Sequence, residues 1–148
     1  MADLPNAEAS YPGKGADGVA PPSRLGADWV DSVGLDQYDS SQRFDRPREQ
    51  LDRTLDMARK YGKAFSVPEW GVWSGGADKL NESGFGDRPS FVGFMVDWLN
   101  TGPARAGVPL LYHSYFNQPP PFPSSLDRNP KSQAEFIERF RARAGDTR

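Results

Sequence analysis

The sequence predicts an α/β fold in which three strand-then-helix units follow one another along the chain. Apolar, strand-like runs begin near residues 29, 63 and 108, and a segment with helical apolar spacing follows each of them. Because a whole crossover unit separates successive strands, the strands should be parallel and buried, with the helices outside. Three such units could begin a doubly wound sheet or belong to a closed barrel, and periodicity alone does not separate these architectures.

The length of the chain limits how much of a larger fold it can contain. Its 148 residues are enough for one domain with a core. A complete (β/α)₈ barrel needs about 250 residues, so a barrel interpretation can apply only to part of a barrel. Residues 1–27 are rich in Pro, Gly and Ala, and we expect a loop-rich or disordered lead-in there. Residues 28–144 then carry the three units.

The first unit combines a short strand with an amphipathic helix. We expect the strand over residues 29–35, ending in the polar run 36–39. The helix is expected over residues 48–61, where apolar residues recur at helical spacing, and Gly62 stands where a C-cap glycine would. The recurring apolar residues are Leu51, Leu55 and Ala58.

The second unit has the strongest helical pattern. Its strand is expected over residues 63–70, with Pro68 near the end, where a missing N–H costs little. A glycine-rich loop, residues 71–86, leads to Asp87, which is expected to cap a helix with Pro89 in its first turn. The apolar face of this helix consists of Phe91, Phe94, Met95, Trp98 and Leu99.

The third unit begins with an apolar strand over residues 108–116. It leads into the proline-rich run 119–123, which we interpret as a rigid connector. Asn129 at the N-cap and Pro130 at the first helical position predict the start of the last helix. Its apolar stripe is expected to contain Ala134, Phe136, Ile137 and Phe140.

Composition argues against several classes of partner and cofactor. The net charge is −2, with 18 basic and 20 acidic residues and no dense basic block, so nucleic acid is not expected as a partner. Without cysteines and with His113 as the single histidine, no zinc site is expected. Asp28, Asp31, Asp36 and Asp39 lack calcium-loop spacing and predict a solvated acidic rim, and no nucleotide motif is present, so we expect no cofactor. No apolar run predicts a membrane span or a signal peptide.

One glutamate stands out by its position. In both kinds of α/β fold the working residues lie just past the carboxyl ends of the strands. Among six glutamates, only Glu69 falls at a strand end, between Pro68 and Trp70. A carboxylate at such a position costs free energy because it loses hydration. Its presence there indicates either a functional role or a structural ion pair. Position alone favours neither of the two.

Three strand-end segments together resemble those of a known enzyme family. They are residues 29–39, residues 62–71 with the run Val-Pro-Glu-Trp-Gly, and residues 112–116 with Tyr-His-Ser-Tyr-Phe. In this order they resemble the last three strands in the clan that includes the endo-β-mannanases of glycoside hydrolase family 26. The resemblance covers roughly residues 28–141. It implies the C-terminal part of a (β/α)₈ (TIM) barrel.

The resemblance also implies a function. It implies retaining hydrolysis of a β-1,4-linked polysaccharide, with mannan as the first choice, by two carboxyl groups about 5 to 5.5 Å apart. Glu69 matches the nucleophile. Tyr38 matches a tyrosine that hydrogen-bonds this nucleophile, the alternative being a plain buried tyrosine. The other substrate-binding candidates are Asp36, Trp70, Trp73, His113 and Tyr115. We expect at least one of Trp70, Trp73 and Tyr115 in the core rather than in a sugar platform.

The acid/base residue of the clan comes from its fourth strand. Residues 28–144 resemble only the last three strands and do not include it. Asp36 is the only local substitute at a strand end, and the family pattern does not place the acid there. We therefore expect a chain that is inactive alone, or active only when another chain completes the barrel. The parent enzyme is expected to be secreted, with its signal upstream of Met1. The alternatives are a truncated chain that binds carbohydrate without cleaving it, a gene remnant, and a self-contained α/β domain of unrelated function.

Overall fold

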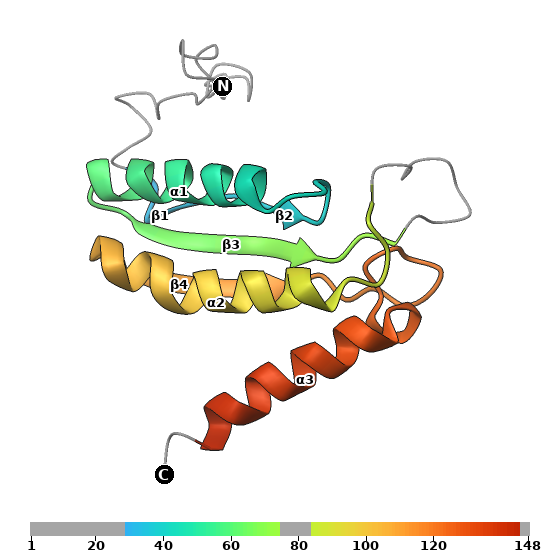
Figure 1. The fold of residues 1–148 in the computed structure, drawn as a ribbon. Helices are drawn as coiled ribbons and strands as arrows, with labels where there is room; N and C mark the ends of the chain where they lie inside the picture. Colours follow the sequence, from blue (N-terminus) through green and yellow to red (C-terminus); the bar gives the residue numbers. More distant parts are fainter. Residues whose placement is uncertain (1–28, 75–83, 146–148) are drawn as a thin grey trace, which may run out of the picture.

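The computed structural model describes residues 29–74 and 84–145 (Figure 1). The expected lead-in and the middle of the glycine-rich loop lie outside these residues. In chain order the elements are β1 (Ser32–Gly34), β2 (Gln37–Tyr38), α1 (Asp45–Lys60), β3 (Ala64–Gly71), α2 (Pro89–Ala106), β4 (Leu110–Tyr115), the 3₁₀ helix η4 (Leu126–Arg128) and α3 (Pro130–Gly145). The three predicted strand-then-helix units are all present.

The strands form one parallel sheet with β3 at its centre. β1 and β2 pair with successive parts of the same edge of β3, with Val33 opposite Phe65 and Gln37 opposite Trp70. β4 pairs with the other edge of β3. The parallel arrangement confirms the prediction made from the strand spacing.

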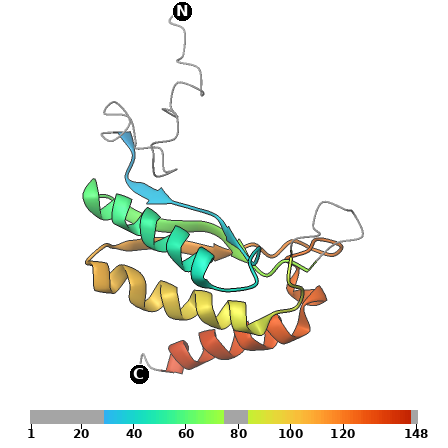
Figure 2. The same cartoon turned by 45° about the horizontal axis from the view of Figure 1, so that its top comes forward.

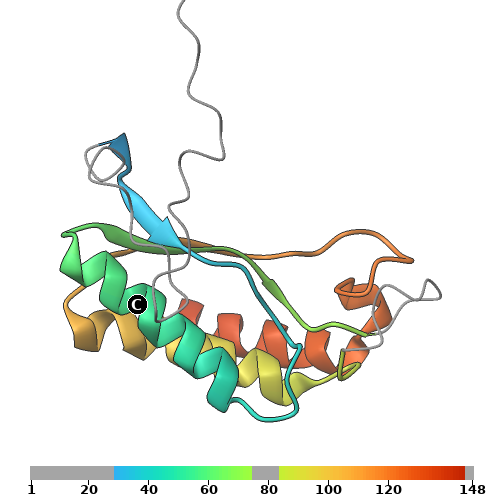
Figure 3. The same ribbon diagram turned by 90° about the horizontal axis from the view of Figure 1, so that it is seen from above.

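The helices cover only one face of this sheet. Figure 3 shows α1, α2 and α3 together on the same side of the strands. In a doubly wound sheet, successive helices would be divided between both faces, whereas in a (β/α)₈ barrel all helices lie outside and the other face points into the barrel. The one-sided cover therefore favours the barrel segment over the doubly wound sheet.

The core lies between β3 and the helical layer. The three helices lie side by side, with α2 in the middle (Figure 2). From β3, Phe65 packs edge-on against Trp98 of α2 and Trp70 packs against Phe136 of α3, with ring centroids 5.5 and 6.1 Å apart. All five apolar residues predicted for the α2 face are buried. No helix in the described ranges is long and apolar enough to cross a membrane.

The first unit differs from its predicted bounds at both ends. Trp29 and Val30 are 87% and 40% exposed, and strand pairing starts only at Ser32. Pairing with β3 stops for two residues after Gly34. It resumes at Gln37 and Tyr38, which form a second short strand, β2, in the polar run that follows the predicted strand. α1 begins at Asp45, three residues before the predicted start, since Pro47 is compatible with the first helical turn.

The apolar stripe predicted for α3 is only partly correct. Phe136 and Phe140 pack against the core, whereas Ile137 is 40% exposed and Ala134 is also exposed. α3 turns Phe136 toward Trp70 and Tyr115 and turns Glu135 toward Gly93 of α2, so Ala134 and Ile137 lie outside both contacts.

The predicted role of Asp87 is wrong, because this residue caps α3 rather than α2. α2 has no side-chain cap, and Arg88 holds its N-cap position. The carboxylate of Asp87 instead accepts hydrogen bonds from the N–H groups of Lys131 and Ser132, at 2.9 and 2.8 Å, and from the Ser132 hydroxyl at 2.7 Å. Asn129 does precede α3 as predicted, but its amide donates to the carbonyls of Pro123 and Ser125.

Replacing Asp87 with alanine is expected to lower the free energy of unfolding by about 1 kcal/mol, as the loss of a helix cap does. Partial burial acts to raise the pKa of Asp87, but the hydrogen bonds from Ser132 and Lys131 outweigh it and lower the pKa. The cap therefore stabilises the fold above about pH 4, the ordinary aspartate range, and this contribution disappears as the pH falls through the lowered folded-state pKa. Denaturant titrations at neutral and acidic pH measure the difference. The nearby exposed Asp127→Ala is the control, and an equal loss in both variants would contradict the capping role.

Candidate functional site

Glu69 lies near the carboxyl end of β3, on the sheet face that the helices leave uncovered. Its neighbour Trp70 is fully buried against Phe136 on the helical side. Because successive side chains of a strand point to opposite faces, Glu69 points away from the helices. The pairing with β4 shifts between Val67 and Trp70, which is a β-bulge at Pro68 and Glu69. Bulges of this kind redirect a side chain next to an active site.

The hydroxyl of Tyr38 donates a hydrogen bond to Oε2 of Glu69 at a distance of 2.8 Å. Tyr38 reaches this position because β2 pairs with the end of β3, which sets Tyr38 opposite Gly71. Burial raises the pKa of Tyr38 well above its usual value, and the hydrogen bond and charge of Glu69 and the charge of Asp36 raise it further. Tyr38 therefore stays protonated and serves as a fixed donor to one carboxylate oxygen.

The ring of Tyr38 belongs to a continuous group of four aromatic rings. The ring of Tyr38 meets Trp73 edge-on at 4.8 Å and Phe116 at 6.2 Å. Phe122 completes the group, at 5.7 Å from Trp73 and 5.3 Å from Phe116. Phe116 and Phe122 were not predicted as site residues from the sequence. The sign that could have revealed them is an aromatic residue at the end of a strand and another within the proline-rich connector.

Three predicted site residues lie on the helical side instead. Trp70 has no exposed surface, and its indole N–H donates to Nδ1 of His113 at 3.2 Å. Tyr115 packs on Trp70 and donates its hydroxyl to the carbonyl of Ser124. The ring of His113 lies against Phe140 of α3. These residues build the core beneath the site, because the bulge in β3 turns Trp70 toward α3 while Glu69 turns away.

The two strand-end aspartates differ in their surroundings. Asp36 is exposed, and its charge acts on Tyr38. The expectation that Asp39 belongs to a solvated acidic rim is wrong, since Asp39 is fully buried and pairs with Arg88 at 2.9 Å. Burial raises the pKa of Asp39 to about 6, although Arg88 acts in the opposite direction. Arg88, from the N-cap of α2, is a third residue near the site, after Phe116 and Phe122, that was not predicted from the sequence.

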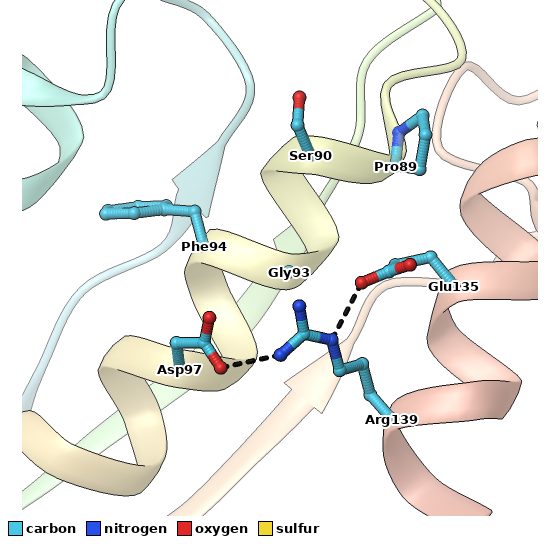
Figure 4. A pocket seen from close by; sticks show the side chains of 7 residues that line it. All are labelled: Pro89, Ser90, Gly93, Phe94, Asp97, Glu135 and Arg139. Carbon is cyan, nitrogen blue, oxygen red and sulfur yellow. Dashed lines mark hydrogen bonds and ion pairs between the residues drawn. The ribbon is translucent and has the colours of Figure 1, made fainter.

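A groove of about 470 Å³ lies elsewhere, on the outer surface between α2 and α3. Figure 4 shows Arg139 of α3 within it, paired with Asp97 of α2 and Glu135 of α3. These ion pairs join two helices on the far side of the sheet from Glu69. We therefore assign the groove to helix packing. Within the described residues, no group of three or more His, Cys, Asp or Glu side chains could hold a metal ion.

Comparison with known proteins finds a similar fold. The structure is similar to the catalytic domain of a family-26 endo-β-1,4-mannanase from Bacillus sp. JAMB-750, with a TM-score of 0.52 and 18% sequence identity. The match covers 80% of this chain and 33% of the mannanase domain, so the chain spans about a third of that structure. No family model matches the sequence, and no curated protein does. The likeness shows the fold, which is α/β and consistent with a partial (β/α)₈ barrel.

Proposed function

We propose that this chain is the C-terminal part of a glycoside hydrolase that cleaves β-1,4-linked polysaccharide, mannan first among the candidates, with Glu69 as its nucleophile. The single observation that carries the proposal is the Tyr38–Glu69 hydrogen bond, on the uncovered face at the carboxyl end of a parallel strand. This is the edge at which barrel enzymes carry out their chemistry. The mannanase domain with a similar fold supports the choice of substrate class.

In the proposed mechanism, Tyr38 holds one oxygen of Glu69, and the other oxygen is available for attack. The free carboxylate oxygen attacks the anomeric carbon of the sugar, and the bond from that carbon to the leaving sugar breaks. A separate acid protonates the leaving oxygen. The same acid, now deprotonated, then takes a proton from a water molecule, which attacks the same carbon, releases the Glu69 carboxylate and gives a product with retained configuration.

The proposal requires a partner segment that supplies the acid. Retaining glycosidases place the second carboxyl group about 5 to 5.5 Å from the nucleophile. Among the described residues at the strand ends, Asp39 is committed to Arg88, and Asp36 is exposed beside Tyr38. We therefore propose that the remaining strands of a barrel, in the same or another polypeptide, supply the acid and close over the uncovered sheet face.

The proposal is tested by completing the barrel. The chain would be co-expressed with the N-terminal half-barrel of a family-26 mannanase, and the complex would be assayed on mannan and cellulose oligomers. We expect hydrolysis of the mannan oligomers, with retention of the anomeric configuration by NMR. The chain alone is the negative control. Inversion of configuration, or equal turnover by the chain alone, would contradict the proposed mechanism.

The aromatic group also favours a second candidate function, which is carbohydrate binding without cleavage. Sugar rings stack on aromatic faces, and Trp73 is half-buried between Tyr38 and Phe122 at the edge of the uncovered face. Such binding needs no acid partner and could persist in the chain alone.

Replacing Trp73 with alanine is expected to weaken mannohexaose binding about fivefold or more, because one stacked ring contributes on the order of 1 kcal/mol or more. Isothermal titration calorimetry measures the change. Trp98→Phe is the matched control, because it replaces a core indole that lies away from the carboxyl ends of the strands. This variant should bind mannohexaose as the wild type does. Equal affinity of the Trp73 variant and the wild type would remove Trp73 from the proposed sugar site.

A further inference from the structure

The guanidinium of Arg88 holds the loop that follows β2 at three points. It donates hydrogen bonds to Oδ1 of Asp39 at 2.9 Å and to the carbonyls of Ser41 and Gln42 at 2.9 and 2.6 Å. The planar group also lies over the ring of Phe44, 4.3 Å from its centroid. A planar fork with several donors is the geometry that guanidinium offers and an ammonium group does not.

Asp39 connects this contact to both strand ends of the candidate site. It follows Tyr38 directly, and its own N–H donates to the carbonyl of Gly71, two residues after Glu69, at 3.1 Å. Its carboxyl group is fully buried, and Oδ2 has no hydrogen-bond partner among the described residues. Such a group is tolerated only while a cation remains beside it, so Asp39 and Arg88 fix each other's position.

We infer that Arg88 is a positioning residue for the Tyr38–Glu69 pair. By holding Asp39 and the two carbonyls after it, Arg88 fixes the end of β2, and this directs the Tyr38 hydroxyl at Oε2 of Glu69. Arg88 itself makes none of its hydrogen bonds to Tyr38 or Glu69 and acts through Asp39. The consequence for catalysis rests on the proposed function, but the positioning can be measured without it.

The measurement is the titration of Tyr38 in the full chain, followed by NMR of tyrosine labelled at Cζ. Tyr38→Phe assigns its signal among the five tyrosines. In the wild type, burial and Glu69 keep the pKa of Tyr38 above its usual value. The wild-type signal should therefore stay that of the protonated ring over the whole pH range in which the chain is folded. In Arg88→Ala we expect the signal to begin to titrate within that range, because the hydroxyl loses its fixed partner and its pKa falls toward the ordinary value of about 10. In Glu69→Gln, which removes the same partner's charge, a downward shift is also expected.

Two further variants make the result decisive. Arg88→Lys keeps a positive charge but cannot reach three acceptors in one plane, so a smaller downward shift is expected even if Arg88→Ala does not fold. Arg139→Ala is the matched control, because Arg139 is also an arginine that donates to several acceptors, here two carboxylates, but it lies between α2 and α3. An unchanged Tyr38 titration in a folded Arg88 variant, or an equal shift in Arg139→Ala, overturns the inference. These titrations do not depend on hydrolase activity. A negative hydrolase assay would therefore contradict the proposed function without contradicting the positioning role of Arg88.

Discussion

Replacing Glu69 with glutamine is expected to abolish mannan hydrolysis by the completed barrel, with a loss on the order of 10⁴-fold or more in kcat. The loss is this large because a neutral amide cannot form the glycosyl ester, and removal of a catalytic nucleophile typically costs several powers of ten. The amide keeps the size of the side chain and can still accept the Tyr38 hydrogen bond through its oxygen. The variant should therefore fold and assemble as the wild type does.

The matched control for Glu69 is Glu49→Gln on α1. The Glu49 carboxylate is exposed and pairs with Arg53, one turn away on the helix, so its removal should change activity less than twofold. Tyr38→Phe should give an intermediate loss, since it removes a fixed hydrogen bond to the carboxylate but not the carboxylate itself. Turnover by the Glu69 variant within tenfold of the wild type would exclude Glu69 as the nucleophile.

Replacing Trp98 with alanine is expected to lower the free energy of unfolding by about 3 to 5 kcal/mol. Trp98 is 2% exposed and joins three elements, since it packs edge-on against Phe65 of β3 and donates its indole N–H to Asp52 of α1 at 2.8 Å. Gly102, one turn further along α2, has no room for a side chain, because a Cβ there would lie 2.9 Å from the Trp98 ring. The indole therefore fills its space, and its removal leaves a cavity.

Two variants separate packing from hydrogen bonding at Trp98. Trp98→Phe should cost about 1 to 2 kcal/mol, since it keeps a ring but loses the N–H. Asp52→Ala should cost about 1 kcal/mol or less, because Asp52 is exposed and only the hydrogen bond is lost. Denaturant unfolding of the full chain, followed by circular dichroism, measures all three. A loss below about 1 kcal/mol in Trp98→Ala would contradict the central place of Trp98 in the core.

The sequence predicts the order of elements well because burial sets a period that can be read from the residues. The five positions that the apolar spacing predicted on α2 are all buried, and Gly62, with a φ of 60°, follows α1 as the predicted C-cap glycine would. The hydrogen bond between Tyr38 and Glu69 agrees with what the family resemblance implied, and strand spacing alone indicated only that both residues lie at the same edge of the sheet.

The features that sequence reasoning missed depend on contacts between distant residues. Arg88 meets Asp39 across 49 positions, and Asp87 meets Ser132 across 45, and no local pattern reveals either pair. The bulge at Pro68 and Glu69 also cannot be predicted from a strict alternation of side chains between the two faces of the strand. The sequence therefore left open which of Trp70, Trp73 and Tyr115 belongs to the core, and the structure places Trp70 and Tyr115 there. Local sequence preferences do not indicate which distant residues come into contact.

The most direct measurement is to trap the covalent intermediate in the completed barrel. A 2-fluoro mannoside with a dinitrophenolate leaving group needs no acid to start the reaction, and its fluorine slows the release of the sugar from the enzyme. We expect mass spectrometry of the digested protein to find the fluoro-sugar on Glu69, and to find none in the Glu69→Gln variant. Hydrolysis that proceeds with the sugar on another residue, or with an inverted product and no trapped sugar, would contradict the role of Glu69.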